Sequence, residues 1–488
     1  MRPLARTDRL LGAGVVAAAA AVLLARIAPD VRGKPLYEDE AVAGLIGARP
    51  LRELLDTVML DRGGAPLHFV LAHAVFQFDT SAEALRWLSV ACAIAAVPVC
   101  FDLGWLLGGT AAGVVAAVVV ASSTALGVYG SFGRMYALFV LVAAVAADLF
   151  VRAVRLRSLG AVLAAALGAW LLPAVHPYGA IPALAELAVA AVLWRRRSLR
   201  IALPVAVIAG AAVPFLLADV TLADRAQVGS GEAFASPGDA WNQLVAALSA
   251  FAGGDGLPLL AFTALALVGL AVLARREPGA VVLAAAVAVP PLAFLVLRAG
   301  SAPDLSPRHL FYALPLWAAS IGVGTAWLVR GLPSAAGAVA IAAIALAAVA
   351  SPRSALRDPR ELGLLPTEVP GSAHAERGDL IFPYATPFLA DLEHVRHAVP
   401  LPQGPGDLIL DALDHAEEPI PRVVLAMPEE RRWRVVRLDG PFDKANAIFR
   451  AAEAYGLSRH PAQLEWWYRL VERGLCDAVA DLGPRCPS

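Results

Sequence analysis

Residues 10–28 read LLGAGVVAAAAAVLLARIA, a run dominated by alanine, valine and leucine. An α-helix rises about 1.5 Å per residue, so this run is long enough to cross a bilayer. Arg2, Arg6 and Arg9 precede it, and such positive charge favours a cytoplasmic N-terminus. A cleaved signal peptide is the competing interpretation, but the run exceeds the usual apolar length and no clear cleavage site precedes Pro29. We therefore predict a retained first transmembrane helix.

The composition of the whole chain excludes an ordinary soluble protein. Of its 488 residues, 59% are hydrophobic and 17% are charged, and the mean hydropathy is +0.66. These values are typical of polytopic membrane proteins. The formal net charge is -1, and the sequence shows no concentrated basic face of the kind that binds phosphate backbones, so a nucleic-acid partner is not expected. The expected location is the cell (plasma) membrane.

Ten further apolar runs are predicted to be transmembrane helices, which makes eleven with the first. They lie at 86–107, 110–128, 135–151, 159–175, 179–194, 199–217, 257–274, 279–297, 310–329 and 334–350. The run at 66–78 is too short to span, so we interpret it as interfacial or re-entrant. Excluding it places the arginine clusters that follow the spans on the same side as the N-terminus. A chain of eleven spans that begins inside ends outside.

The last part of the chain has a different character. Proline and charged residues become frequent after Ala350, alternating patterns at 379–384 and 421–426 predict strands, and 443–480 has helical spacing. The predicted fold is an all-α polytopic membrane domain at 1–350. A small extracytoplasmic α/β domain at 351–488 follows it.

The four cysteines divide by location. Cys92 and Cys100 lie inside an apolar run, where a thiol usually acts as a small packing residue. Cys476 and Cys486 lie in the polar C-terminal region, and an extracytoplasmic location would allow them to form a disulfide. Their spacing permits this pair without requiring it.

The stretch Tyr37-Glu38-Asp39-Glu40 places three carboxylates side by side just after the first helix. Adjacent acids repel one another and are costly to dehydrate, so the stretch is either a solvated acidic loop or a binding site. Apolar residues between 45 and 59 then recur at three- and four-residue spacing. This spacing predicts an amphipathic helix along the membrane surface.

Most unusual polar residues of the membrane domain fall in or beside the predicted outer loops. They are Glu38, Asp39, Glu40, Asp61, Arg62, His68, Arg86, Arg134, Tyr136, His176, Tyr178, Arg308 and His309. Carboxylates beside arginine and histidine suit a substrate that carries a phosphate and an acceptor that must lose a proton. The alternative is that Arg134 and Arg308 simply lie at the lipid headgroups, as arginines at helix ends often do.

Six short motifs together resemble a known family. They are Asp39-Glu40, Gly64-Ala-Pro-Leu-His68, Leu85-Arg86, Ser131-Phe-Gly-Arg-Met-Tyr136, His176-Pro-Tyr-Gly179 and Pro307-Arg-His-Leu310. In this order and spacing the chain is similar to the protein O-mannosyltransferase-like branch of the GT-C glycosyltransferases, a glycosyltransferase family 39-like group that includes the bacterial Rgt-type enzymes. The similarity covers residues 1–350.

The resemblance implies that a sugar moves from a polyprenyl-phosphate donor to a glycan, lipid or protein acceptor on the outer side, with inversion at the anomeric carbon. It assigns the catalytic base to Asp39, with Glu40 beside it. It also implies that the lipid phosphate is held by arginines near the outer face. These map to Arg86, Arg134 and Arg308.

The remaining assignments concern the substrate groove. His176 and Tyr178 either line this groove or cap a helix, and Tyr136 is placed beside them. His68 falls where relatives have a proline motif with histidine or lysine, but the order here is Pro66-Leu-His68, which departs from the family pattern. No cofactor is expected to be required. A divalent metal held by Asp39, Glu40 and a histidine is the less favoured alternative.

Two other classes of function compete with a transferase. A transporter or lipid flippase usually carries ionisable residues near the membrane midplane. Here Glu186, in the predicted sixth span, is the one candidate, because Asp102 and Asp148 lie near the predicted inner ends. A membrane anchor that displays the C-terminal domain would need one helix rather than eleven.

Overall fold

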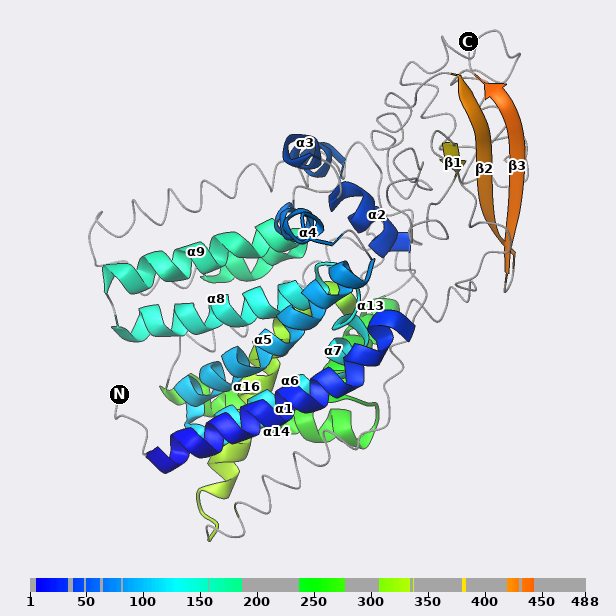
Figure 1. The fold of residues 1–488 in the computed structure, drawn as a ribbon. Helices are drawn as coiled ribbons and strands as arrows, with labels where there is room; N and C mark the ends of the chain where they lie inside the picture. The colour runs from blue at the N-terminus through cyan, green and yellow to red at the C-terminus, as the bar shows by residue number, and fades with distance from the viewer. Residues whose placement is uncertain are drawn as a thin grey trace. The chain divides into compact units, whose positions relative to one another are not determined.

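The computed structural model describes the chain in several stretches. These are residues 6–33, 38–47, 50–61, 65–79, 82–156, 158–186, 237–276, 307–333, 337, 380–382, 419–429 and 432–442. They are mostly helical, with one small sheet towards the C-terminus (Figure 1). The chain divides into two compact units, one made of 1–31, 86–217 and 229–358 and the other of 32–85, 218–228 and 359–488.

The first unit contains most of the helices. They are most of α1 (Arg6–Gly33) and of α5 (Ala82–Gly108), whose residues 32–33 and 82–85 belong to the second unit, and all of α6 (Thr110–Ser122), α7 (Thr124–Tyr129), α8 (Tyr136–Leu156), α9 (Leu159–Val175), the 3-10 helix η1 (Pro177–Gly179), α13 (Pro237–Ala252), α14 (Leu257–Arg276), the 3-10 helix η2 (Pro307–Ala313) and α16 (Leu314–Val329). Residues 180–186 are also helical.

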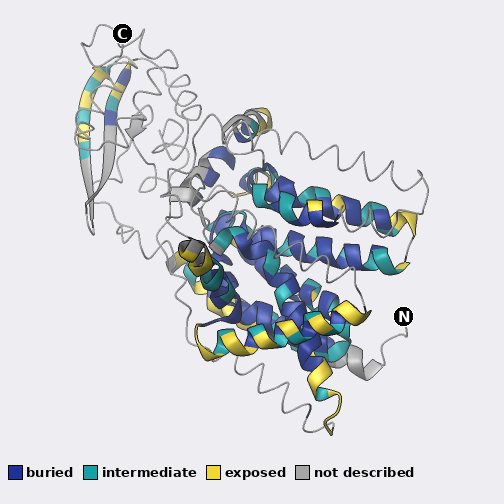
Figure 2. Cartoon of the chain, turned by 180° about the vertical axis from the view of Figure 1, so that it is seen from behind, coloured by how far each residue is buried: buried dark blue, intermediate teal, exposed yellow. Residues whose placement is uncertain are grey.

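Five helical stretches among the described residues are long and apolar enough to cross a membrane. They lie within α1, α5, α8 and α14 and along η2 with α16. Exposed leucines on α14, namely Leu257, Leu260 and Leu267, suit contact with lipid better than contact with water. Figure 2 shows this pattern of exposed outer faces around a buried interior. The chain is therefore an integral membrane protein.

Most predicted spans are found as helices. The spans expected at 86–107, 135–151, 257–274 and 310–329 correspond to α5, α8, α14 and α16, and the span at 159–175 has the bounds of α9. The spans expected at 199–217, 279–297 and 334–350 lie outside the described residues, apart from Gly337, as does the second half of 179–194.

The prediction of one continuous span at 110–128 is wrong. The helix breaks at Ser123, which has an extended backbone and separates α6, of 13 residues, from α7, of 6 residues. Ser123 Oγ donates to the Val120 carbonyl at 2.9 Å and accepts from the Leu126 amide at 3.3 Å. A serine side chain that bonds to nearby main chain in this way favours a helix start over a helix interior.

Close backbone contact holds several of these helices together. A Cβ atom at Gly322 of α16 would overlap the main chain of Ala112 on α6, and one at Gly269 of α14 would overlap the main chain of Ser320 on α16. Small residues permit such approach between membrane helices. Arg26, inside the first apolar run, donates from Nη1 to the Ala121 carbonyl at 2.9 Å, which links α1 to α6.

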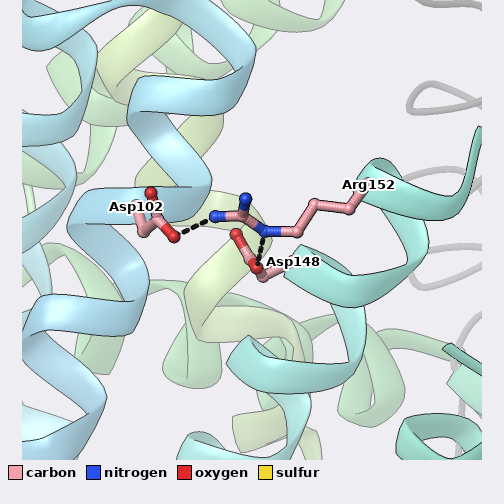
Figure 3. A network of polar contacts seen from close by, with 3 residues as sticks. All are labelled: Asp102, Asp148 and Arg152. Atoms are coloured by element: carbon pink, nitrogen blue, oxygen red, sulfur yellow. Dashed lines mark hydrogen bonds and ion pairs between the residues drawn. The ribbon is translucent and has the colours of Figure 1, made fainter. Parts of the chain in front are cut away.

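A charged network joins α5 to α8, as Figure 3 shows. Arg152 Nε donates to Asp148 Oδ2 at 2.6 Å, and Arg152 Nη2 pairs with Asp102. Two of the intramembrane acids seen in the sequence are thus paired with one cation. Cys92 and Cys100 of α5 are free and buried, as expected for packing residues.

The second unit begins with three short helices, α2 (Glu38–Gly47), α3 (Leu51–Asp61) and α4 (Leu67–Phe76). They share a core of apolar side chains, namely Ala43, Ile46, Leu54, Val58, Phe69, Ala72, Phe76 and Leu85. The predicted amphipathic helix corresponds to α3, in which Leu54 and Val58 are buried while Leu51 and Arg52 are exposed. At 10 residues, α4 is too short to span a membrane, as expected.

The acidic stretch is helical rather than an irregular loop, because Glu38, Asp39 and Glu40 form the first turn of α2. Negative charge in the first turn is favoured by the helix dipole. Local sequence therefore stabilises the start of α2.

The sheet has strands β1 (Leu380–Phe382), β2 (Ile420–Glu429) and β3 (Arg432–Phe442) in that order. β1 runs parallel to β2, and β2 runs antiparallel to β3. The two strands predicted from alternation are β1 and β2, whereas β3 and helix α13 were not predicted. The expected helix at 443–480, Cys476 and Cys486 lie outside the described residues.

Candidate functional site

Three short segments of the first unit come together. They are the connection at 130–135 between α7 and α8, η1 after α9, and η2 before α16. α8 contacts η2, α9 contacts η1, and η1 contacts η2. The motifs that contain Tyr136, His176 and Arg308 therefore meet in space.

His176 lies at the centre of this cluster and is buried. It precedes Pro177, and a residue before proline favours an extended backbone; His176 is extended and ends α9. Its ring stacks on Phe139 of α8, with centroids 4.9 Å apart and planes 11° apart. Its Nδ1 accepts a hydrogen bond from the Tyr178 amide at 3.2 Å. His176 therefore caps η1, which is one of the two roles that the sequence left open.

The charge state of His176 follows from its surroundings. Burial lowers the pKa of His176 well below its ordinary value, and its electrostatic interactions with His309, Arg134 and Arg308 lower this pKa further. Because Nδ1 accepts a hydrogen bond, the neutral ring carries its proton on Nε2. His176 is therefore a neutral hydrogen-bond donor rather than a cation.

A second stack lies beside the first. The rings of Tyr178 and His309 are parallel within 4°, with centroids 5.0 Å apart. His309 is also 5.6 Å from His176 between ring centroids. This stack joins η1 to η2, whereas the stack of His176 on Phe139 joins the end of α9 to α8.

Two cations border these rings. The Arg308 guanidinium carbon lies 5.6 Å from the centre of the Tyr136 ring, a distance at which cation and ring attract. Arg134 is half-buried, and its carbonyl accepts from Ser89 Oγ of α5 at 3.3 Å. Both guanidiniums lower the pKa of His176, so the electrostatic potential in the cluster is positive.

An aromatic layer supports the cations. Tyr129 lies 5.0 Å from Tyr136 and 5.2 Å from Phe311 between ring centroids. Edge-to-face aromatic contacts of this kind add about 0.5–1.5 kcal/mol beyond buried area. The connection at 130–135 is thereby attached to η2.

Arg86 has a structural contact of its own. It is buried on α5, and its Nη1 donates to the Val31 carbonyl of α1 at 3.0 Å. At least one of its donors is therefore used to join α1 to α5. Its assignment to the donor phosphate stays a prediction.

The predicted acids and His68 belong to the second unit. Glu40 is 1% exposed, and His68 is 1% exposed with its ring at an edge-to-face angle to Phe69. Asp39 lies in the first turn of α2, and its side chain is outside the described residues. In the described part of the chain, no three His, Cys, Asp or Glu side chains are placed to hold a metal ion.

Sequence reasoning left two polar residues of η2 out of the candidate set. His309 Nδ1 and Tyr312 Oη are buried and have no hydrogen-bond partner among the described residues. His309 was visible as a polar residue of an outer loop, directly after Arg308. Tyr312 lies at the start of a predicted apolar span, where nothing in the pattern separates a functional tyrosine from a packing one.

No protein-family model and no curated protein matches the chain by sequence. Among solved structures, ArnT from Cupriavidus metallidurans in the apo state is similar, with a TM-score of 0.53 and 14% identity over 87% of this chain and 97% of that one. The chain has the fold of ArnT. This is the polytopic GT-C fold that the sequence predicted.

Two further structures are similar at lower scores. ArnT from Cupriavidus metallidurans bound to undecaprenyl phosphate has a TM-score of 0.46 and 16% identity, over 71% of this chain and 70% of that chain. The oligosaccharyltransferase of Archaeoglobus fulgidus, tethered to an acceptor peptide, has a TM-score of 0.46 and 13% identity, over 85% and 69%. The likeness to apo ArnT concerns the fold alone and does not distinguish the protein O-mannosyltransferase-like branch.

Proposed function

We propose that this protein is an integral membrane glycosyltransferase. It transfers a sugar from a polyprenyl-phosphate donor to a glycan, lipid or protein acceptor on the extracytoplasmic face. The single observation that carries the proposal is the meeting of Arg134, Arg308 and the rings of Tyr136, His176 and Tyr178 in one cluster of a GT-C fold.

The cations of this cluster suit a lipid phosphate. A guanidinium binds phosphate oxygens through two N–H groups at once. Arg134 and Arg308 both raise the positive potential around His176, and we assign them, with Arg86, to the donor phosphate. Neutral His176 and the Tyr178 ring then line the substrate groove beside Tyr136.

In the proposed reaction the Asp39 carboxylate, with Glu40 beside it, removes the proton of the acceptor hydroxyl. The acceptor oxygen forms a bond to the anomeric carbon from the face opposite the phosphate. The bond between that carbon and the phosphate oxygen breaks, and polyprenyl phosphate leaves with the electron pair. Inversion follows from the single displacement. Arginines stabilise the charge that grows on the departing phosphate.

A reconstituted assay tests this function. The purified protein in proteoliposomes is given a panel of polyprenyl-phosphate sugars together with mixed glycan, lipid and peptide acceptors. We expect one sugar of the panel to be consumed with release of polyprenyl phosphate. Consumption of none, with the protein folded and the panel complete, would refute the proposed donor class.

A transporter or flippase is the second candidate, and one observation favours it. Glu186 is 4% exposed, and its Oε2 has no hydrogen-bond partner among the described residues. A buried acid inside a predicted span often marks a transport pathway. Movement of labelled polyprenyl phosphate across liposomes in the absence of acceptor, lost in Glu186→Gln, would favour this function over group transfer.

A further inference from the structure

His309 has a buried nitrogen that the transferase roles above do not use. Its Nδ1 has no hydrogen-bond partner among the described residues. A buried polar atom without a partner costs about 1–3 kcal/mol. A ligand oxygen that arrives at this nitrogen would therefore be stabilised there.

The groups around His309 come from three elements. η2 itself supplies Arg308, η1 supplies Tyr178, and His176 follows α9. Arg134 interacts electrostatically with His176, and the Tyr136 ring contacts Arg308. Arg134 and Arg308 place positive charge near the two histidines. A second proton on His309 would lie beside Arg308, so an anion must be present before the ring can hold it.

The two histidines of the cluster are not equivalent. His176 Nδ1 accepts from the Tyr178 amide at 3.2 Å, so a proton on that nitrogen would break the cap of η1. His309 Nδ1 has no such bond among the described residues. His309 is thus the ring that can gain a proton without the loss of a described hydrogen bond.

We propose that His309 takes up a proton when a lipid phosphate binds beside Arg308, so that its Nδ1–H donates to a phosphate oxygen. The inference rests on the proposed function, because it takes the ligand of Arg308 to be a polyprenyl phosphate. The proton comes from solvent on binding and returns to it on release. The N–H bond formed at His309 on binding is broken again on release, and no bond between heavy atoms of the protein changes.

The chemistry of transfer makes this proton useful. The donor is a phosphodiester with one negative charge. When its bond to the sugar breaks, the released polyprenyl phosphate carries a second charge. An imidazolium beside Arg308 places another positive group against the charge as it grows, which is where electrostatic stabilisation accelerates a reaction.

Calorimetry measures the proton directly. Undecaprenyl phosphate is titrated into the purified full-length protein at pH 7.5 in buffers of different ionisation enthalpy, and the slope of the heat against that enthalpy gives the protons taken up. We expect net uptake by the wild type. We expect uptake to fall towards zero in His309→Gln, with binding about 10- to 100-fold weaker. His73→Gln, whose ring bonds to the Gly47 carbonyl at 3.0 Å in the second unit, should keep the wild-type uptake.

Undecaprenyl phosphate can itself gain a proton, so a second probe is needed. Dihexadecyl phosphate is a phosphodiester with no second ionisation near pH 7. Uptake by the wild type on binding this probe would come from the protein, and this measurement does not depend on whether His309→Gln folds. No uptake with the diester, or equal uptake in wild type and His309→Gln, would overturn the inference. Failure of the wild type to bind either probe would instead refute the proposed donor class.

Discussion

Tyr178 and His309 stack with their rings parallel within 4° and 5.0 Å apart, although they come from two separate 3-10 helices. The stack fixes η1 against η2 and so holds Arg308 beside the Tyr136 ring. η1 follows the apolar helix α9, and η2 precedes the apolar helix α16. The arrangement of the cation cluster therefore depends on ring packing between distant parts of the sequence.

Removal of the Tyr178 ring should weaken use of the donor. Aromatic pairs add about 0.5–1.5 kcal/mol beyond buried area, so Tyr178→Ala should raise the KM for the polyprenyl-phosphate sugar by about 2- to 10-fold. Tyr178→Phe keeps the ring and should behave as the wild type. Equal donor KM in Tyr178→Ala and Tyr178→Phe would show that the stack does not position the site.

Loss of Arg134 should have a larger effect on the donor. Charge-assisted hydrogen bonds contribute about 1.5–3 kcal/mol, so Arg134→Ala should raise the donor KM by at least tenfold, and Arg134→Lys should restore part of this. Arg32→Ala is the control, because Arg32 pairs with Glu83 at a side-chain exposure of 79% and exposed pairs contribute little. An unchanged dependence on donor concentration in Arg134→Ala would remove this arginine from the phosphate site.

The depressed pKa of His176 predicts a pH-dependent stability. Burial and nearby positive charge lower this pKa, so the unfolded chain binds the proton more readily than the folded one. The stabilisation is complete above the ordinary histidine pKa of about 6.5 and is lost as the pH falls below it, by at most about 1.4 kcal/mol per pH unit.

The thermal unfolding midpoint, followed from pH 7.5 to pH 5, measures this effect. His176→Asn removes the titrating ring and keeps an acceptor for the Tyr178 amide. Its midpoint should fall less steeply with acid than that of the wild type. Identical slopes would mean that other groups carry the acid sensitivity.

The charged network between α5 and α8 should contribute to stability. Arg152→Gln leaves Asp148, which has 10% side-chain exposure, without its cation, and we expect a loss of about 1–3 kcal/mol. A simultaneous Asp148→Asn removes the buried charge as well and should recover part of the loss. Unfolding midpoints measured in the same detergent would contradict this if the double variant were less stable than Arg152→Gln.

The parts of the fold that sequence reasoning predicted are those fixed by local pattern. Apolar length is enough to predict α5, α8 and α9, and alternation is enough for β2. The break at Ser123 depends on one side chain bonding to its own main chain, inside a run that is otherwise apolar. Nothing in such a run separates a capping serine from one that bonds back to its own helix, as Ser122 does.

The candidate site shows the same limit. The motifs around Tyr136, His176 and Arg308 were visible as polar residues near the ends of predicted spans, because polar groups are rare there. Which rings stack was not predictable, since the pairs join segments far apart in the chain. His309 was therefore noted as a polar residue without a role, and Tyr312, two residues after the motif Pro307-Arg-His-Leu310, was missed.

The role of Asp39 tests the central claim most directly. The rate of sugar transfer is measured in proteoliposomes with the donor that the wild type consumes, for Asp39→Asn and for Glu83→Gln as a control that removes another carboxylate of the second unit. The account predicts a fall of about 100-fold or more in Asp39→Asn, with binding of undecaprenyl phosphate retained, and an unchanged rate in Glu83→Gln. Transfer by Asp39→Asn at the wild-type rate would contradict it.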